Sequence, residues 1–302
     1  CYEVNELIEA VVENVAYRRH SETRQRSGKR PTFKSKEISM ILCGLQSTRK
    51  PSKSIEKLIN MTLSTARRSR IWLSNGDEIT AALTGLQRIG NNGQISRTSI
   101  KYIIDSLQRL QQQRHHHFQG KRRNHNGEYS GTTYDERHQT RKNSSNSADC
   151  YMSQRQIATC IYAMQSMTTE SAETRVLLQM LARTLTIELR GENMLDESNV
   201  ARMIYGLQSM TCSPIGARDK AVRATLQIIL SRLDRNTVST FSGRHMAMIT
   251  YGLKSMTSNT KEVRGLLSSL KTIATLPTSS MEAPDSRNQI TNQNFAFILF
   301  GL

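Results

Sequence analysis

Six polar residues recur at one fixed place in a stretch that is repeated along the chain. Each lies seven positions before the small residue at the centre of its copy: Glu37, Glu78, Gln156, Asn199, His245 and Asn294. Helical-repeat proteins that read single-stranded RNA contact one base per repeat through side chains that vary in this way. The six residues are therefore candidates for base readout. The alternative is that they form only the first exposed turn of a helix.

A second fixed position follows the small residue by two. It is occupied by Gln46, Gln87, Gln165, Gln208 and Lys254. A nearly constant Gln carries no sequence code, so this position would suit a contact with an RNA backbone. A structural hydrogen bond to the adjoining turn would explain it equally well.

Four arginines occupy one place in a second recurring pattern: Arg97, Arg175, Arg223 and Arg264. Stacked once per repeat, they could form a ladder that faces the phosphates of a nucleic acid. Equally, each could pair with a nearby acid such as Glu173 or Glu262.

The elements that must position these residues are helical. The repeated stretch is clearest at Val200–Met210, and its copies centre on Gly44, Gly85, Ala163, Gly206, Gly252 and Gly301. Apolar residues fall six, three and two positions before the small residue and one after it, which is a stripe of period near 3.6. We call this element helix A. Gly in a helix costs about 1 kcal/mol relative to Ala, so its reuse predicts a tight crossing.

A second apolar pattern, helix B, follows each copy. Glu262–Leu270 aligns without gaps on Glu173–Leu181. Together the patterns give a helical hairpin of about 40–49 residues, a length typical of stacked two-helix repeats. The sequence therefore predicts an all-α fold, an α-solenoid of stacked helical hairpins.

We expect one such array over residues 1–302, cut at both ends. Its expected parts are helix B of a partial repeat at 1–20, repeats at 37–70, 77–112, 153–190, 196–233 and 242–276, a disordered, basic, His-rich insert at 113–150, and the start of a sixth repeat at 292–302.

Composition limits the classes of function. A net charge of +17 points to a polyanionic partner. Five cysteines without a Cys-x-x-Cys pair indicate buried thiols in an intracellular reducing compartment. No apolar run is long enough for a transmembrane segment. We find no catalytic constellation, metal-ligand set or cofactor motif, so we expect no enzyme, cofactor or small-molecule substrate.

The phrase Tyr-Gly-Leu-Gln-Ser-Met at 205–210 and the Glu-Val-Arg pattern at 262–264 resemble organellar helical-repeat proteins, most closely the octotricopeptide and related families. The resemblance implies an α-solenoid in a mitochondrion or chloroplast. Such proteins bind organellar RNA and govern its maturation, stability or translation. The Val-Arg of helix B is also similar to HEAT repeats, which implies protein scaffolding.

Two hypotheses follow. A single-stranded RNA-binding solenoid would gather its Lys and Arg residues along one continuous groove. A HEAT-like scaffold with protein partners would show an apolar patch, with adaptable surfaces suggested by four methionines: Met164, Met167, Met210 and Met256.

Overall fold

The computed structural model describes residues 33–47, 52–89, 93–124, 152–189, 194–213, 216–233 and 241–274. These ranges are mainly helical, and their one β-bridge joins Cys212 to Met256. The elements are α2 (Ser35–Cys43), η1 (Gly44–Ser47), α3 (Lys53–Arg68), α4 (Gly76–Leu86), α5 (Gln94–Asn124), α6 (Gln154–Ala163), α7 (Ala172–Glu188), α8 (Glu197–Gly206), η4 (Ala217–Asp219), α9 (Lys220–Ser231), α11 (Gly243–Leu253) and α12 (Lys261–Ala274).

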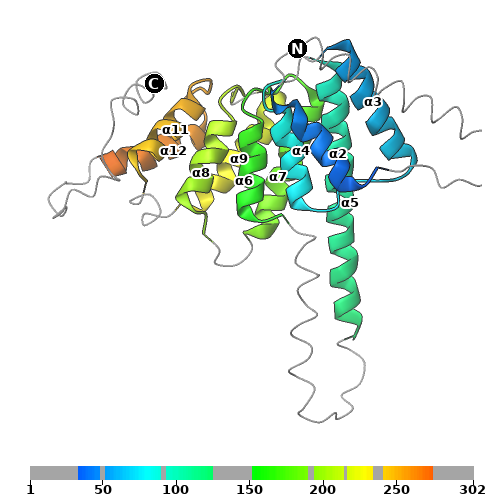
Figure 1. Ribbon diagram of the computed structural model, residues 1–302. Helices are drawn as coiled ribbons and strands as arrows, with labels where there is room; N and C mark the ends of the chain where they lie inside the picture. The colour runs from blue at the N-terminus through cyan, green and yellow to red at the C-terminus, as the bar shows by residue number, and fades with distance from the viewer. Residues whose placement is uncertain are drawn as a thin grey trace, which may run out of the picture.

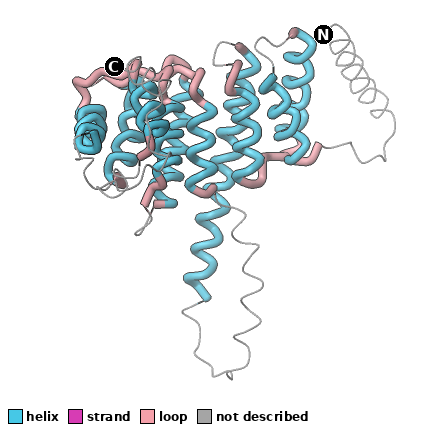
Figure 2. The backbone as a smooth tube through the Cα atoms, turned by 60° about the vertical axis from the view of Figure 1, so that its left-hand side comes forward, coloured by secondary structure: helices cyan, strands magenta, loops and turns pink. Residues whose placement is uncertain are grey.

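The helices pack in two rows. In the A row, α2, α4, α6, α8 and α11 each contact the next member, and in the B row the same is true of α3, α5, α7, α9 and α12. Contacts between the rows join α2 to α3, α4 to α5 and α6 to α7. Figures 1 and 2 show the helices standing side by side. The chain is therefore all-helical in its described part, with neighbouring helices packed on one another.

Short polar side chains begin the A-row helices. Asn75, Ser153, Asp196 and Ser242 each accept a hydrogen bond from a backbone amide in the first turn of the helix that follows. Such caps satisfy donors that have no partner inside the helix. Asp and Ser are among the residue types most favoured at this position, so the caps at Asp196 and Ser242 can be read from the sequence.

The core follows the apolar stripes. Ile79, Ile157 and Val200, all six positions before the small residue, are completely buried. Three of the methionines expected at the surface, Met164, Met167 and Met210, are also completely buried, and Met256 packs half-buried against the core. The expectation of an adaptable methionine surface is therefore wrong, because these residues lie on the same stripe as the core.

The small residue marks the place where one A-row helix crosses the backbone of the preceding one. A Cβ placed on Gly85 would overlap the carbonyl of Leu42, and one on Gly206 would overlap that of Ile161. Gly252 meets Ile204 in the same way. In each case the overlapped carbonyl belongs to the residue two positions before the small residue of the preceding copy. The tight crossing is thus confirmed, and it joins successive A-row helices.

Hydrogen bonds at the ends of the A-row helices repeat in the same register. Ser209 Oγ donates to the carbonyl of Gln165 at 2.5 Å, and Ser255 Oγ donates to that of Gln208 at 2.7 Å. Ser166 donates to Gln87 in the equivalent place. The recurring Gln-Ser pair therefore links each helix end to the next.

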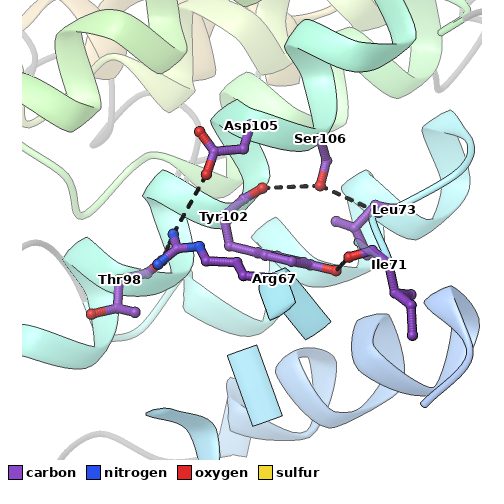
Figure 3. Close-up of polar contacts among 7 residues, drawn as sticks. All are labelled: Arg67, Ile71, Leu73, Thr98, Tyr102, Asp105 and Ser106. Carbon is purple, nitrogen blue, oxygen red and sulfur yellow. Dashed lines mark hydrogen bonds and ion pairs between the residues drawn. The ribbon is translucent and has the colours of Figure 1, made fainter. Parts of the chain in front are cut away.

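The connector from α3 to α4 is held on α5. Tyr102 Oη donates to the carbonyl of Ile71 at 2.9 Å, and Leu73 N donates to Ser106 Oγ at 3.2 Å (Figure 3). Beside them Arg67 pairs with Asp105 at 3.7 Å. Because Tyr102 is completely buried, this anchor fixes the first described hairpin on the second.

Helix α5 runs on to Asn124, past the repeat boundary expected at residue 112, and extends beyond the other helices (Figure 1). Residues 113–119 contain no Gly or Pro, so nothing in that stretch stops a helix. The rest of the expected insert, residues 125–150, and the elements expected at 1–20 and 292–302 lie outside the described residues. None of the described helices is both long and apolar enough to cross a membrane.

The close crossing at Gly206 predicts that adding one methyl group there destabilises the folded chain. In Gly206→Ala the helix gains about 1 kcal/mol of propensity, but the added Cβ overlaps backbone that must move. We expect the free energy of unfolding to fall by about 2 kcal/mol, measured by urea denaturation followed by circular dichroism.

Gly44→Ala is the matched control, because a Cβ there meets no described atom within 4 Å and the backbone is right-handed helical. Its stability should stay the same or rise slightly. Equal losses in both variants would show that the crossing is not the reason for the glycine.

Candidate nucleic-acid interface

Three tyrosines, one from each of α6, α8 and α11, form a stack along the A row. The ring centroids of Tyr162 and Tyr205 are 5.6 Å apart, and those of Tyr205 and Tyr251 are also 5.6 Å apart, with interplanar angles of 23° and 20°. All three side chains are half-buried. The two faces of Tyr205 are thus covered by its neighbours, which leaves ring edges for other contacts. Interhelical packing is confirmed as a role of these rings.

Cations lie beside this stack. Lys254 Nζ sits 3.7 Å from the centroid of the Tyr251 ring, a cation–π contact. Among the residues of α6, α8, α11 and the turns that follow them, the cationic side chains that are not buried are Arg155, Arg202, Arg244 and Lys254. The acidic side chains that are not buried there are Glu197 and, in the turn after α6, Glu170; Asp196, the cap of α8, is also exposed. Cations and aromatic rings thus lie close together in this part of the A row, with acids beside them.

A pocket of about 360 Å³ opens where the same three helices meet. Its lining residues are Thr159 and Tyr162 from α6, Ser198 and Arg202 from α8, and Arg244, His245 and Met248 from α11. Arg202 is half-buried and Arg244 is exposed. Neither guanidinium has a hydrogen-bond or ion-pair partner among the described residues, so both are free to bind an anion.

His245 is surrounded by charges of both signs. Burial lowers its pKa; Glu197 and Asp196 act in the opposite direction, and Arg244 and Arg202 lower it by smaller amounts. Its Nδ1 is buried and has no hydrogen-bond partner in the described part of the chain. The ring also packs edge-on against Phe241. The imidazole is therefore favoured in its neutral form.

The structure places the candidate base-reading residues at the third position of each A-row helix. Glu37 and Gln156 reach back to accept from Lys34 N and Ser153 N, and with Ser153 as the cap Gln156 completes a capping box. Glu78 accepts from Ser74 N at 2.7 Å and also from Ser35 Oγ of the preceding hairpin at 3.0 Å. These three carboxylate or amide groups thus have roles within the fold.

The remaining candidates at this position differ from one another. Asn199 is buried, with 6% of its surface exposed, whereas His245 lines the pocket. Asn294 lies outside the described residues.

The recurring Gln position has a structural role in several repeats. Gln87, Gln165 and Gln208 provide the carbonyls that bind the serines of the following helix. Gln208 Nε2 also donates to Gln165 Oε1 at 3.4 Å. Gln46 and Lys254 are exposed, so their side chains can reach a ligand.

The arginines of the second pattern divide into two groups. Arg175 donates to the carbonyls of Thr169 and Glu170 at 2.6 and 2.9 Å, and Arg223 donates to that of Gly216 at 3.3 Å. These two hold the loop that links the helices of their own hairpin.

Arg97 and Arg264 are exposed at the same position. The pKa of Glu173 is lowered mainly by the hydrogen bond from Ser171 Oγ and by its own backbone amide, with smaller contributions from Arg97 and Lys101. The four arginines are therefore not equivalent, because two of the guanidinium groups bind loop carbonyls and the other two are exposed.

Exposed cations are present on both rows. The exposed cations of the B-row helices are Lys53, Lys57, Arg68, Arg97, Lys101, Arg109, Arg183, Lys220, Lys261, Arg264 and Lys271. Charge alone therefore does not select one continuous groove, contrary to the expectation for an RNA-binding array. Arg109 also lies over the ring of Trp72, 4.4 Å from its centroid. The A row differs in having a run of three stacked tyrosines next to a pocket.

Within the described residues, no three His, Cys, Asp or Glu side chains come together as a metal site would require. Burial raises the pKa of the Cys160 thiol to about 12, so it stays protonated. Its Sγ lies 3.4 Å from Thr80 Oγ1. This thiol is a core group without nucleophilic character.

The sequence analysis did not single out Arg202 and Arg244. Arg202 lies four positions before the small residue, where other copies carry Met40 or Ala81, whereas Arg244 lies eight before it, where Lys36 and Arg155 are also cationic. Only the register between adjacent helices brings the two guanidinium groups to one pocket. The spacing of Tyr251 and Lys254, three residues apart near a helix end, was a signal that sequence reasoning could have used.

Comparison with known proteins gives no relative: no family model, curated protein or solved structure matches the chain.

His245 predicts a pH dependence of stability. Because its pKa in the folded protein is below the value of about 6.5 expected when unfolded, the unfolded chain takes up the proton first. The free energy of unfolding should therefore fall as the pH drops from about 6.5 towards the lower folded-state pKa.

Urea denaturation at about pH 7.5 and about pH 5.5 measures this fall in the wild type and in His245→Gln. The variant should lose less stability between the two conditions. An equal loss in both proteins would mean that His245 does not titrate in this window.

Proposed function

We propose that this chain is an α-solenoid that binds single-stranded RNA across the A-row surface of α6, α8 and α11. Its proposed role is in the maturation, stability or translation of organellar RNA, as the family resemblance implies. The stacking of each hairpin on the next in two rows supports the solenoid.

One observation carries the proposal: the tyrosine stack has Lys254 on its last ring, and Tyr162 shares a pocket with Arg202 and Arg244. Proteins that bind single strands combine a positively charged path for the backbone with aromatic groups for the bases. Cations bind the phosphates by displacing condensed counterions.

The rings restrict how a base could bind. Tyr162 and Tyr251 cover the faces of Tyr205, so a base would contact ring edges and phenol hydroxyls there. Lys254, which is exposed beside the last ring, would contact the sugar-phosphate backbone. A single strand suits this arrangement because its bases are not already paired.

The scaffold hypothesis has less support. Its adaptable methionines are in the core, and the large apolar side chains that are exposed, Met40, Val176 and Met194, belong to α2, α7 and the segment before α8. They are scattered singly, which is normal for a protein surface.

The test is binding of the purified chain to a random pool of single-stranded RNA at two salt concentrations, with double-stranded DNA alongside. We expect preference for RNA and selection of a short motif. Lys254→Gln should weaken RNA binding several-fold and reduce the slope of log affinity against log salt by about 0.7, because one phosphate contact is lost.

Arg183→Gln is the matched control, since it removes one exposed cation from α7 in the B row. It should leave affinity nearly unchanged. Weak, unselective binding that disappears at moderate salt, or equal effects of the two substitutions, would contradict the proposed interface and favour a protein scaffold.

A further inference from the structure

We propose that the pocket between α6, α8 and α11 binds a phosphate group of a nucleic-acid strand, held by Arg202 and Arg244. This inference rests on the proposed RNA-binding function and assigns one site within it. It also couples the protonation of His245 to the binding of the phosphate.

The two guanidinium groups reach the pocket from different helices. Arg202 comes from the middle of α8 and Arg244 from the first turn of α11, and both line the same cavity. Among the described residues neither has a polar partner that would have to be displaced. Guanidinium is the group best matched to phosphate oxygens, because its planar donors bind them in pairs.

Two backbone amides near the pocket are already engaged. Ser198 N donates to Asp196 Oδ1 at 2.8 Å, and His245 N donates to Ser242 Oγ at 3.4 Å. The Thr159 hydroxyl already donates to the carbonyl of Arg155. The side-chain donors left in the lining are the two guanidinium groups, the hydroxyls of Ser198 and Tyr162 and the ring N–H of His245.

The size of the pocket indicates more than a bare ion. At about 360 Å³ it falls at the lower end of the range of ligand pockets, roughly 300–1,000 Å³. Tyr162 belongs both to this lining and to the tyrosine stack. A phosphate in the pocket would therefore lie next to the ring edges proposed to meet the bases.

His245 borders the same site and responds to the charge within it. Arg244 and Arg202 lower its pKa, and Asp196 and Glu197 raise it; Tyr162 faces it from α6 and Phe241 packs on its ring. A phosphate would neutralise part of the field of the two guanidinium groups. Binding should therefore raise the pKa of His245, and binding should tighten as the pH falls.

The experiment is an NMR titration of the full chain that follows the imidazole signal of His245. The chain has seven histidines, and His245→Gln identifies the signal. Three probes are compared: inorganic phosphate, uridine 5′-monophosphate, and the dinucleotide uridylyl-uridine. The dinucleotide carries one phosphodiester, whereas the mononucleotide carries a terminal phosphate.

We expect at least one nucleotide probe to raise the pKa of His245. Arg202→Gln and Arg244→Gln should each weaken binding of that probe by about tenfold, the usual effect of losing one charged hydrogen bond. Arg183→Gln on α7 should leave it unchanged. A response to the dinucleotide assigns the pocket to phosphates within the strand, and a response to the mononucleotide alone assigns it to a strand end.

The pocket assignment is overturned if no probe moves the His245 signal, or if Arg183→Gln weakens binding as much as the pocket variants do. In either case preferential RNA binding by the chain would still leave the proposed function standing. If the chain shows no preference for RNA but the His245 signal still responds to a phosphate probe, the proposed function is contradicted and the phosphate site stands.

Discussion

The close approach of each A-row helix to the backbone of the preceding one is the constraint on which the rest of the structure depends. At Gly85, Gly206 and Gly252 the absence of a side chain allows a contact with a main-chain carbonyl. A contact with backbone fixes the register along the helix axis, because it is made to one residue and not to an adaptable side chain. The serine-to-carbonyl bonds and the stacked tyrosines repeat with that register.

Several surface features follow from this register. The residue before the glycine stacks on its equivalent in the next helix, as Tyr205 does on Tyr162. The serine three positions after the glycine reaches the preceding turn, as Ser209 does. Arg202 from the middle of α8 and Arg244 from the first turn of α11 line one cavity although they occupy different positions in their copies. The glycine crossing thus positions both the packed side chains and the residues of the candidate interface.

The sequence predicted the parts of this arrangement that depend on local spacing. The helices could be inferred from the apolar period within each copy, and the caps at Asp196 and Ser242 from the residue types that begin it. The tight crossing at Gly206 could be inferred from a glycine inside a helical pattern. The extension of α5 was missed because the boundary was drawn from the repeat and not from helix propensity. The role of Glu37 and Gln156 as capping groups was left as the alternative, since polar variability at a first helical turn suits both capping and readout. The pocket depends on distances between helices, which no single copy encodes.

Exposed cations on both rows make the location of bound RNA the central question. Photocrosslinking of the chain to a 4-thiouridine-labelled single-stranded RNA, followed by mass spectrometry of the linked peptides, tests it most directly. Crosslinks are expected in the segments that carry Tyr162, Tyr205 and Tyr251. Crosslinks confined to B-row segments, such as those around Arg97 and Arg264, would contradict the A-row interface.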